Sequence, residues 1–195
     1  MRKVKLTESS LIVTWFTPVF GKMKTVAKGA RRPKSAFAGR LDLFFAADIT
    51  FARSRSSELH GLREVMLLDP REGLRKRYER MLLAAYFVEL VEMTTEFEHA
   101  VPEIYDLLAR ALNYLDKNEP TRRAMLRFEG RLGRLLGVIG EHNADVEPAT
   151  AILRLAGQLP PERRALLRAL TPAREEAPLS EGTEAVDVSG DDEGG

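Results

Sequence analysis

The chain of 195 residues contains no cysteine, one tryptophan and three histidines. Without cysteine it can form neither a disulfide nor a thiolate zinc site. His60, His99 and His142 lie far apart in the sequence, without a second histidine at the spacing of a metal-binding pair. The longest early apolar run, residues 11–16 with a threonine inside it, is too short for a signal peptide or a membrane span. We therefore expect an intracellular protein without a metal centre.

Patterns that would indicate catalysis are also missing. Gly21-Lys22 is similar to the end of a phosphate-binding P-loop, but no glycine stands five residues before Gly21. Glu89, Glu92 and Glu96 fall on one face of an expected helix, where a solvated surface explains them better than a carboxylate metal site. We therefore predict a protein that is not an enzyme, with neither catalytic residues nor a cofactor.

The charge of the chain is unevenly distributed along the sequence. Thirty Lys and Arg against 29 Asp and Glu leave a net charge of +1. Residues 1–80 carry 18 basic and 8 acidic side chains, residues 81–170 carry 11 and 13, and residues 171–195 carry 1 and 8. Such a separation is typical of proteins that bind nucleic acid or another anionic surface and that carry an acidic tail.

Residues 1–70 have the pattern of a small β domain. β-Branched and aromatic residues cluster in short segments, and two of these segments alternate in the way of half-buried strands. The expected strands are residues 11–16, 22–28, 43–51 and 59–67. Four or five short strands in about seventy residues predict a small barrel. An OB-fold and an SH3-like barrel both fit this pattern.

After Pro70 the hydrophobic period changes from two residues to about 3.6, which predicts a helical domain over residues 71–170. The expected helices are 71–97 (one helix or two), 102–115 with Pro102 in its first turn, 121–136, 147–155 and 161–170. From residue 171 onward no hydrophobic period remains, and a segment so rich in acidic residues is expected to be disordered. The predicted fold class is α+β, with a β-barrel, then a helical bundle, then an acidic tail.

One stretch of the β domain carries seven cations and no anion. They are Lys22, Lys24, Lys28, Arg31, Arg32, Lys34 and Arg40. Cations release counterions from a polyanion, so if all seven touched a single strand, the slope of log affinity against log salt would be about −5. Phe37 lies in the same polar loop and is a candidate to stack on a base, whereas Trp15 and Phe44 could stack or pack in the core. The alternative for the whole stretch is an ordinary solvated loop.

A second basic surface is expected on the helix of residues 121–136. Its arginines recur at helical spacing on the side away from the apolar residues: Arg123, Arg127, Arg131 and Arg134. This surface could extend a DNA path, bind an acidic protein, or simply be solvated.

Several segments of the sequence resemble the family of the bacterial DNA repair protein RecO. In the β domain these are Glu8–Thr14, Thr17, Gly21-Lys22, Val26–Ser35, and Phe37, Gly39, Leu41 and Phe44. In the helical domain they are Ala85–Leu90, Leu126–Glu129 and Leu135–Gly137. The resemblance covers about residues 5–140, and the block Val26–Ser35 is its most specific part.

The resemblance implies an OB-fold followed by a helical domain and the role of a recombination mediator. Such a protein binds single- and double-stranded DNA and anneals complementary strands. It contacts the acidic tail of single-strand-binding protein and works with RecR to load the RecA recombinase, in the bacterial cytoplasm at the nucleoid. Many members carry a four-cysteine zinc module after the segment that matches Leu135–Gly137, and this chain has none. The family usually has a longer first strand than residues 1–6 supply, so we expect either that the given start is late or that the barrel opens with a shortened edge strand.

Two other functions fit the same features. A plain OB-type module for DNA or RNA would bind strands without mediating recombination, and an adaptor would bind proteins through its helices. The acidic segment 171–195 could fold back onto the basic barrel and compete with DNA, or serve only to keep the protein soluble.

Overall fold

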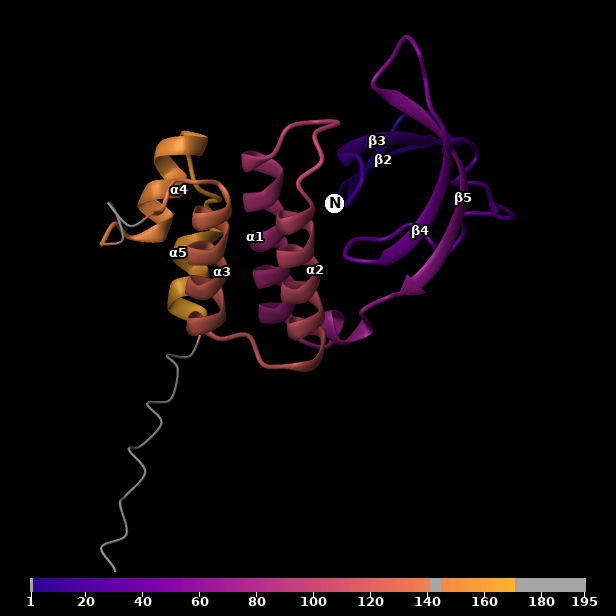
Figure 1. Ribbon diagram of the computed structural model, residues 1–195. Helices are drawn as coiled ribbons and strands as arrows, with labels where there is room; N and C mark the ends of the chain where they lie inside the picture. Colours follow the sequence, from indigo (N-terminus) through magenta and orange to yellow (C-terminus); the bar gives the residue numbers. More distant parts are fainter. Residues whose placement is uncertain (1, 141–144, 171–195) are drawn as a thin grey trace, which may run out of the picture.

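The computed structural model describes residues 2–140 and 145–170, in which strands come first and helices follow (Figure 1). The strands are β1 (Arg2–Lys5), β2 (Leu11–Thr17), β3 (Gly21–Ala27), β4 (Ala46–Ala52) and β5 (Leu59–Asp69). The helical elements are the 3-10 turn η1 (Glu72–Lys76), α1 (Tyr78–Thr94), α2 (Pro102–Lys117), α3 (Arg122–Leu135), α4 (Pro148–Ala156) and α5 (Glu162–Ala169). The predicted disorder of residues 171–195 lies outside the described residues.

The five strands form one sheet in the order β1-β2-β3-β5-β4. β3 and β5 are parallel, and the other neighbouring pairs are antiparallel. This is the strand order of an OB-fold, so the predicted fold class is confirmed. The sheet is strongly curved but not closed, because no pairing among the described residues joins β1 to β4 (Figure 1).

One predicted strand begins later than its sequence pattern indicates. The alternation starts at Leu43, but β4 begins at Ala46. Phe44 has a φ of 67°, a left-handed conformation that breaks an extended strand. The guanidinium of Arg71 donates a hydrogen bond to the carbonyl oxygen of Phe44 and contributes to holding this bend.

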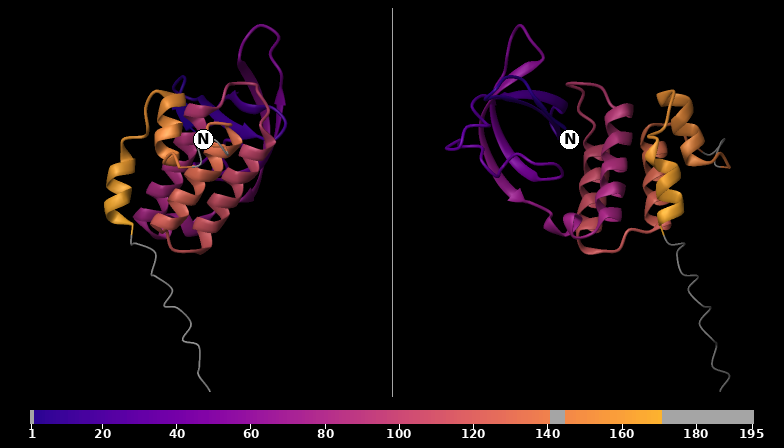
Figure 2. Two further views of the ribbon diagram at one scale, coloured as in Figure 1. Left: turned by 60° about the vertical axis from the view of Figure 1, so that its left-hand side comes forward. Right: turned by 180° about the vertical axis from the view of Figure 1, so that it is seen from behind.

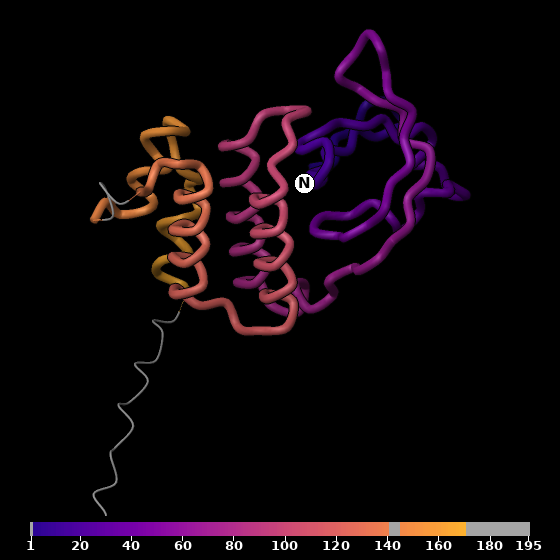
Figure 3. The backbone as a smooth tube through the Cα atoms, in the orientation of Figure 1, coloured from indigo at the N-terminus to yellow at the C-terminus, as the bar shows by residue number. Residues whose placement is uncertain are grey.

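The first predicted helix is divided into η1 and α1, because Arg77 between them has an extended backbone. α1 is buried around most of its circumference and lies inside the bundle, where a single apolar face is not needed. α3 was predicted to within one residue at each end, and the Thr121 side chain caps it by accepting a hydrogen bond from the amide of Ala124 (3.1 Å). Figure 3 shows the path of the chain from the sheet through the helices.

The sheet docks on the helical bundle through the start of β3. Lys22 Nζ donates hydrogen bonds to the carbonyl oxygens of Glu92 and Thr95, both at 2.7 Å, at the carboxyl end of α1. A cation is favoured at this end of a helix because the unpaired carbonyls there carry partial negative charge. Gly21 has a φ of 62°, and a Cβ at this position would lie 1.8 Å from the carbonyl oxygen of His99. Glycine is therefore required at this contact.

We expect Lys22→Met to lower the free energy of unfolding by about 2 kcal/mol, because it leaves two carbonyls without a charged donor. Urea unfolding measures this loss. Lys24→Met is the matched control, since Lys24 shares the ring of Phe97 with Lys22 but makes no hydrogen bond to the α1 end. Equal losses in both variants would contradict a docking role for Lys22.

Candidate nucleic-acid interface

The part of the basic stretch from Lys28 to Arg40 lies in the loop of residues 28–45 between β3 and β4, whereas Lys22 and Lys24 lie in β3 itself. The loop backbone is a series of turns, in which the amide of Arg32 bonds to the carbonyl of Gly29 (3.0 Å) and the amide of Arg40 to that of Phe37 (3.1 Å). Gly29 and Gly39 have φ values of 69° and 71°, which favour glycine. The loop is therefore built from defined turns.

The start of the loop is attached to the segment that precedes β2. The backbone amide of Arg31 donates to the carbonyl oxygen of Ser9 (3.0 Å), and its guanidinium donates to that of Glu8 (2.9 Å). The amide of Gly29 also donates to Ser10 Oγ (3.4 Å). These contacts join two segments that carry the resemblance, Glu8–Thr14 and Val26–Ser35.

Asp42 holds the other end of the loop. Its carboxylate pairs with Lys3 of β1 (2.7 Å) and Arg75 of η1 (3.0 Å), and it accepts a hydrogen bond from the amide of Leu43 (2.9 Å). Burial raises the pKa of Asp42, but the hydrogen bonds from Lys3, Leu43 and Arg75 outweigh it and lower the pKa below its usual range. Both ends of the loop are thus fixed to the fold.

Three side chains project from this anchored loop into solvent: Lys28, Arg32 and Lys34, which we call the loop cations. Among the described residues, none of them makes an ion pair or a side-chain hydrogen bond. Their charges are therefore available to a phosphate backbone. They lie within seven residues of one another, on a scaffold that does not have to be ordered on binding.

The other four cations of the stretch contact groups of the fold itself. Arg40 donates a hydrogen bond to the carbonyl of Val65 (3.1 Å), and Arg31 to that of Glu8, although both side chains remain exposed. Lys24 lies over the ring of Phe97, 4.2 Å from its centroid. Lys22 is only 6% exposed, and burial lowers the pKa of its amine, although the Glu92 carboxylate raises it. The prediction that Lys22 contacts nucleic acid is therefore corrected.

Phe37 is half-buried and packs on the small apolar cluster of the sheet that contains Val13 and Val65. Its ring also lines an open groove of about 510 Å³ beside Arg40 and Arg63. Arg63, on β5, was not singled out in the sequence because it stands in a strand with no basic neighbours. Stacking of a base on Phe37 stays a prediction.

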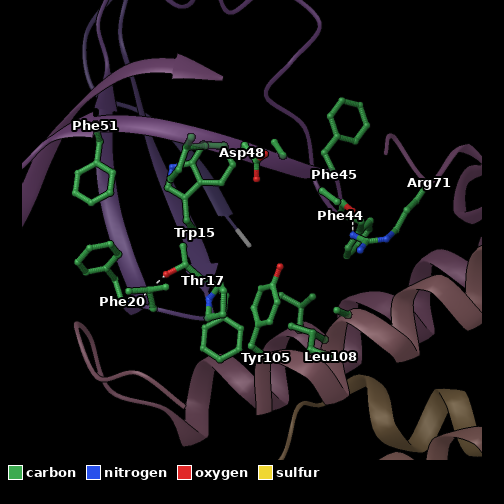
Figure 4. Close-up of a pocket in the computed structure, with 18 residues that line it drawn as sticks. Trp15, Thr17, Phe20, Phe44, Phe45, Asp48, Phe51, Arg71, Tyr105 and Leu108 are labelled. Carbon is green, nitrogen blue, oxygen red and sulfur yellow. Dashed lines mark hydrogen bonds between the residues drawn. The ribbon is translucent and has the colours of Figure 1, made fainter. Parts of the chain in front are cut away.

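A cavity of about 350 Å³ lies between the concave side of the sheet and α2 (Figure 4). Figure 4 shows Trp15, Phe20 and Phe51 on the sheet side, facing Tyr105 and Leu108 of α2. The Trp15 indole N–H donates to Thr25 Oγ1 (2.8 Å), so this ring is held by the fold. The sequence did not indicate the cavity, because its lining comes from distant segments.

The second basic surface is present on α3. Arg123, Arg127, Arg131 and Arg134 are all exposed, and we call them the arginine face. They line two adjoining open grooves, and Leu126 and Pro148 also line one of these grooves. α1 and α2 lie between α3 and the sheet (Figure 2), so a nucleic-acid strand would have to pass around the bundle to touch both basic surfaces.

The described residues contain no group of three His, Cys, Asp or Glu side chains that could hold a metal ion. No helix in that part of the chain is long and apolar enough to cross a membrane.

The fold is an open OB-type sheet with a basic loop, joined to a helical bundle, and OB-folds of other proteins bind oligonucleotides or oligosaccharides. The family described as "Recombination protein O N terminal" matches residues 1–71, and the one described as "Recombination protein O C terminal" matches residues 75–152. The chain therefore belongs to the RecO family, whose members act in DNA repair and recombination.

Individual relatives agree with this assignment. The chain is 29% identical to the DNA repair protein RecO of Syntrophus aciditrophicus over 137 residues, which are 70% of this chain and 53% of the relative. It is 31% identical to that of Rhodopirellula baltica over 137 residues, 70% and 51% of the two chains. With that of Alkaliphilus metalliredigens it shares 36% over 141 residues, 70% and 54%. The chain spans about half the length of these relatives.

Proposed function

We propose that this protein is a recombination mediator in DNA repair. It binds single- and double-stranded DNA, anneals complementary strands, and helps to load RecA on strands coated by single-strand-binding protein. Membership of the RecO family supports the role, and the loop cations are the observation that carries the binding mode. No bond is made or broken in such a process, so the proposal requires no catalytic residue or cofactor.

The loop cations suit a protein that must leave bases free to pair. Lys28, Arg32 and Lys34 address phosphates, which are the same in every sequence, and contact with phosphates positions a strand without reading its bases. Three such contacts to a single strand contribute about −2 to the slope of log affinity against log salt. Arg31 and Arg40, each with one hydrogen bond to the backbone, extend the same surface.

The proposed protein partners are RecR, single-strand-binding protein and RecA. The helical domain is the proposed site of protein contacts, because the arginine face presents four cations beside apolar side chains such as Leu126. An acidic partner would be attracted to such a surface. This role would place the protein in the bacterial cytoplasm, at the nucleoid.

The test is an annealing assay with complementary oligonucleotides, naked and coated by single-strand-binding protein, without ATP. We expect the protein to accelerate pairing of both, with an effect that weakens as the salt concentration rises. Binding without any acceleration on naked strands would contradict the proposal and favour a plain strand-binding module. Acceleration on naked strands alone would contradict the mediator role.

A further inference from the structure

The arginine face lacks any acidic partner among the described residues. α3 carries five exposed arginines, because Arg122 precedes the four of the arginine face. Its one acid, Glu129, is fully buried on the side away from that face, where Arg163 of α5 binds it at 2.8 and 3.0 Å. Like charges repeated along one helix face repel one another, so this surface favours an anionic ligand.

The described chain ends at the level of the first turn of α3, on the side of that helix that carries Glu129. α5 runs antiparallel to α3 (Figures 1 and 3), and Arg163 contacts Glu129. Leu170 lies seven residues after Arg163, and Arg122 lies seven residues before Glu129. At 1.5 Å per residue, both are displaced by about 10 Å toward the same end of the bundle. Residue 171 therefore follows a point beside the first turn of α3.

The sequence beyond residue 170 is complementary in charge to the arginine face. Residues 171–195 carry eight acids and one arginine. A chain of 25 residues can reach about 80 Å when extended, whereas the 14 residues of α3 span about 20 Å. Length and charge both suit the arginine face.

We propose that the acidic segment 171–195 binds the arginine face of α3 in the same molecule. The attachment at Leu170 gives the segment an effective concentration in the millimolar range, so individually weak ion pairs are sufficient. Another polyanion reaches this face only by displacing the segment.

The arginine face is favoured over the loop cations, to which the sequence alone would direct an acidic tail. The loop cations are only three, and their loop joins two strands of the sheet, which lies beyond α1 and α2 from α5 (Figure 2). The arginine face has four cations and a fifth, Arg122, at the end where the segment begins. The tertiary structure thus changes the expected partner of the segment.

The absence of cysteine makes a specific test possible. Ser189→Cys introduces a single thiol near the far end of the segment, to which a nitroxide spin label is attached in the full chain. We expect paramagnetic broadening of backbone amides along α3 at 50 mM salt. The broadening should largely disappear at 1 M salt, where the Debye length is about 3 Å. Broadening of residues 28–40 instead, or none in the described fold, would overturn the proposal.

Two matched variants and one mixture complete the test. The first variant replaces the arginine face by Gln at Arg123, Arg127, Arg131 and Arg134, and it should abolish the broadening. The second replaces the loop cations Lys28, Arg32 and Lys34 by Gln, and it should leave the broadening unchanged. Spin-labelled protein mixed with an unlabelled isotope-enriched copy should broaden nothing at low concentration, and broadening there would mean binding between molecules. The measurement contains no nucleic acid, so its result is independent of the proposed DNA-repair function.

Discussion

Replacing the loop cations Lys28, Arg32 and Lys34 together with glutamine should weaken binding to single-stranded DNA by about 100-fold at 0.1 M salt. Each contact with a single strand contributes about 0.7 to the slope of log affinity against log salt. Loss of three contacts therefore lowers the affinity by about two powers of ten at 0.1 M salt. The slope itself should become less steep by about 2. Fluorescence anisotropy with a labelled oligonucleotide at four salt concentrations measures both quantities.

The control must change the net charge by the same amount at another place. Arg154, Arg164 and Arg168 are exposed on α4 and α5, and among the described residues they make no ion pair. Their replacement by glutamine should weaken binding only slightly and leave the salt slope nearly unchanged. Equal losses in the two triple variants would show that net charge alone drives binding, and that the loop has no special role.

The second large effect is expected at a buried carboxylate in the helical domain. Glu129 is 0% exposed, and its partners are the guanidinium of Arg163 and the hydroxyl of Tyr86. Arg163 also pairs with Glu147 (2.6 Å). The hydrogen bond to Glu129 raises the pKa of Arg163, although burial opposes this shift, and burial together with the Glu129 charge raises that of Tyr86.

Arg163→Met should therefore lower the free energy of unfolding by about 3–5 kcal/mol, because it leaves a buried carboxylate without its cation. That is a large share of the stability of a typical domain, about 5–15 kcal/mol. Urea unfolding followed by helical circular dichroism measures the loss.

Two further variants distinguish an unpaired charge from a general loss of packing. Glu129→Met combined with Arg163→Met should recover most of the stability, since a buried ion pair is often replaced by apolar residues at little cost. Arg164→Met, at the exposed neighbouring position, should stay within about 0.5 kcal/mol of the parent protein. A double variant as unstable as Arg163→Met would contradict the electrostatic explanation.

Much of the fold could be predicted from the sequence because hydrophobic period is a local property. The alternation around β3 (Gly21–Ala27) and the 3.6-residue period around Ile104 and Leu108 identify a strand and a helix without knowledge of their neighbours. Two misplaced boundaries occur where a distant group intervenes. The bend at Phe44, which Arg71 contributes to holding, delays β4, and Phe97 leaves the helical pattern to lie beside Lys22.

The candidate site divides in the same way. The sequence by itself determined the separation of charge, the basic loop, the arginines of α3 and the family, because each of these resides in contiguous or periodic residues. Only the tertiary structure decided which cations remain available, since the groups that engage them are distant in sequence. Lys22 is held by backbone carbonyls about seventy residues away and is not available to the proposed interface, whereas Lys28, Arg32 and Lys34 remain in solvent. The aromatic cavity and the buried Glu129–Arg163 pair likewise exist only because folding brings separate segments together.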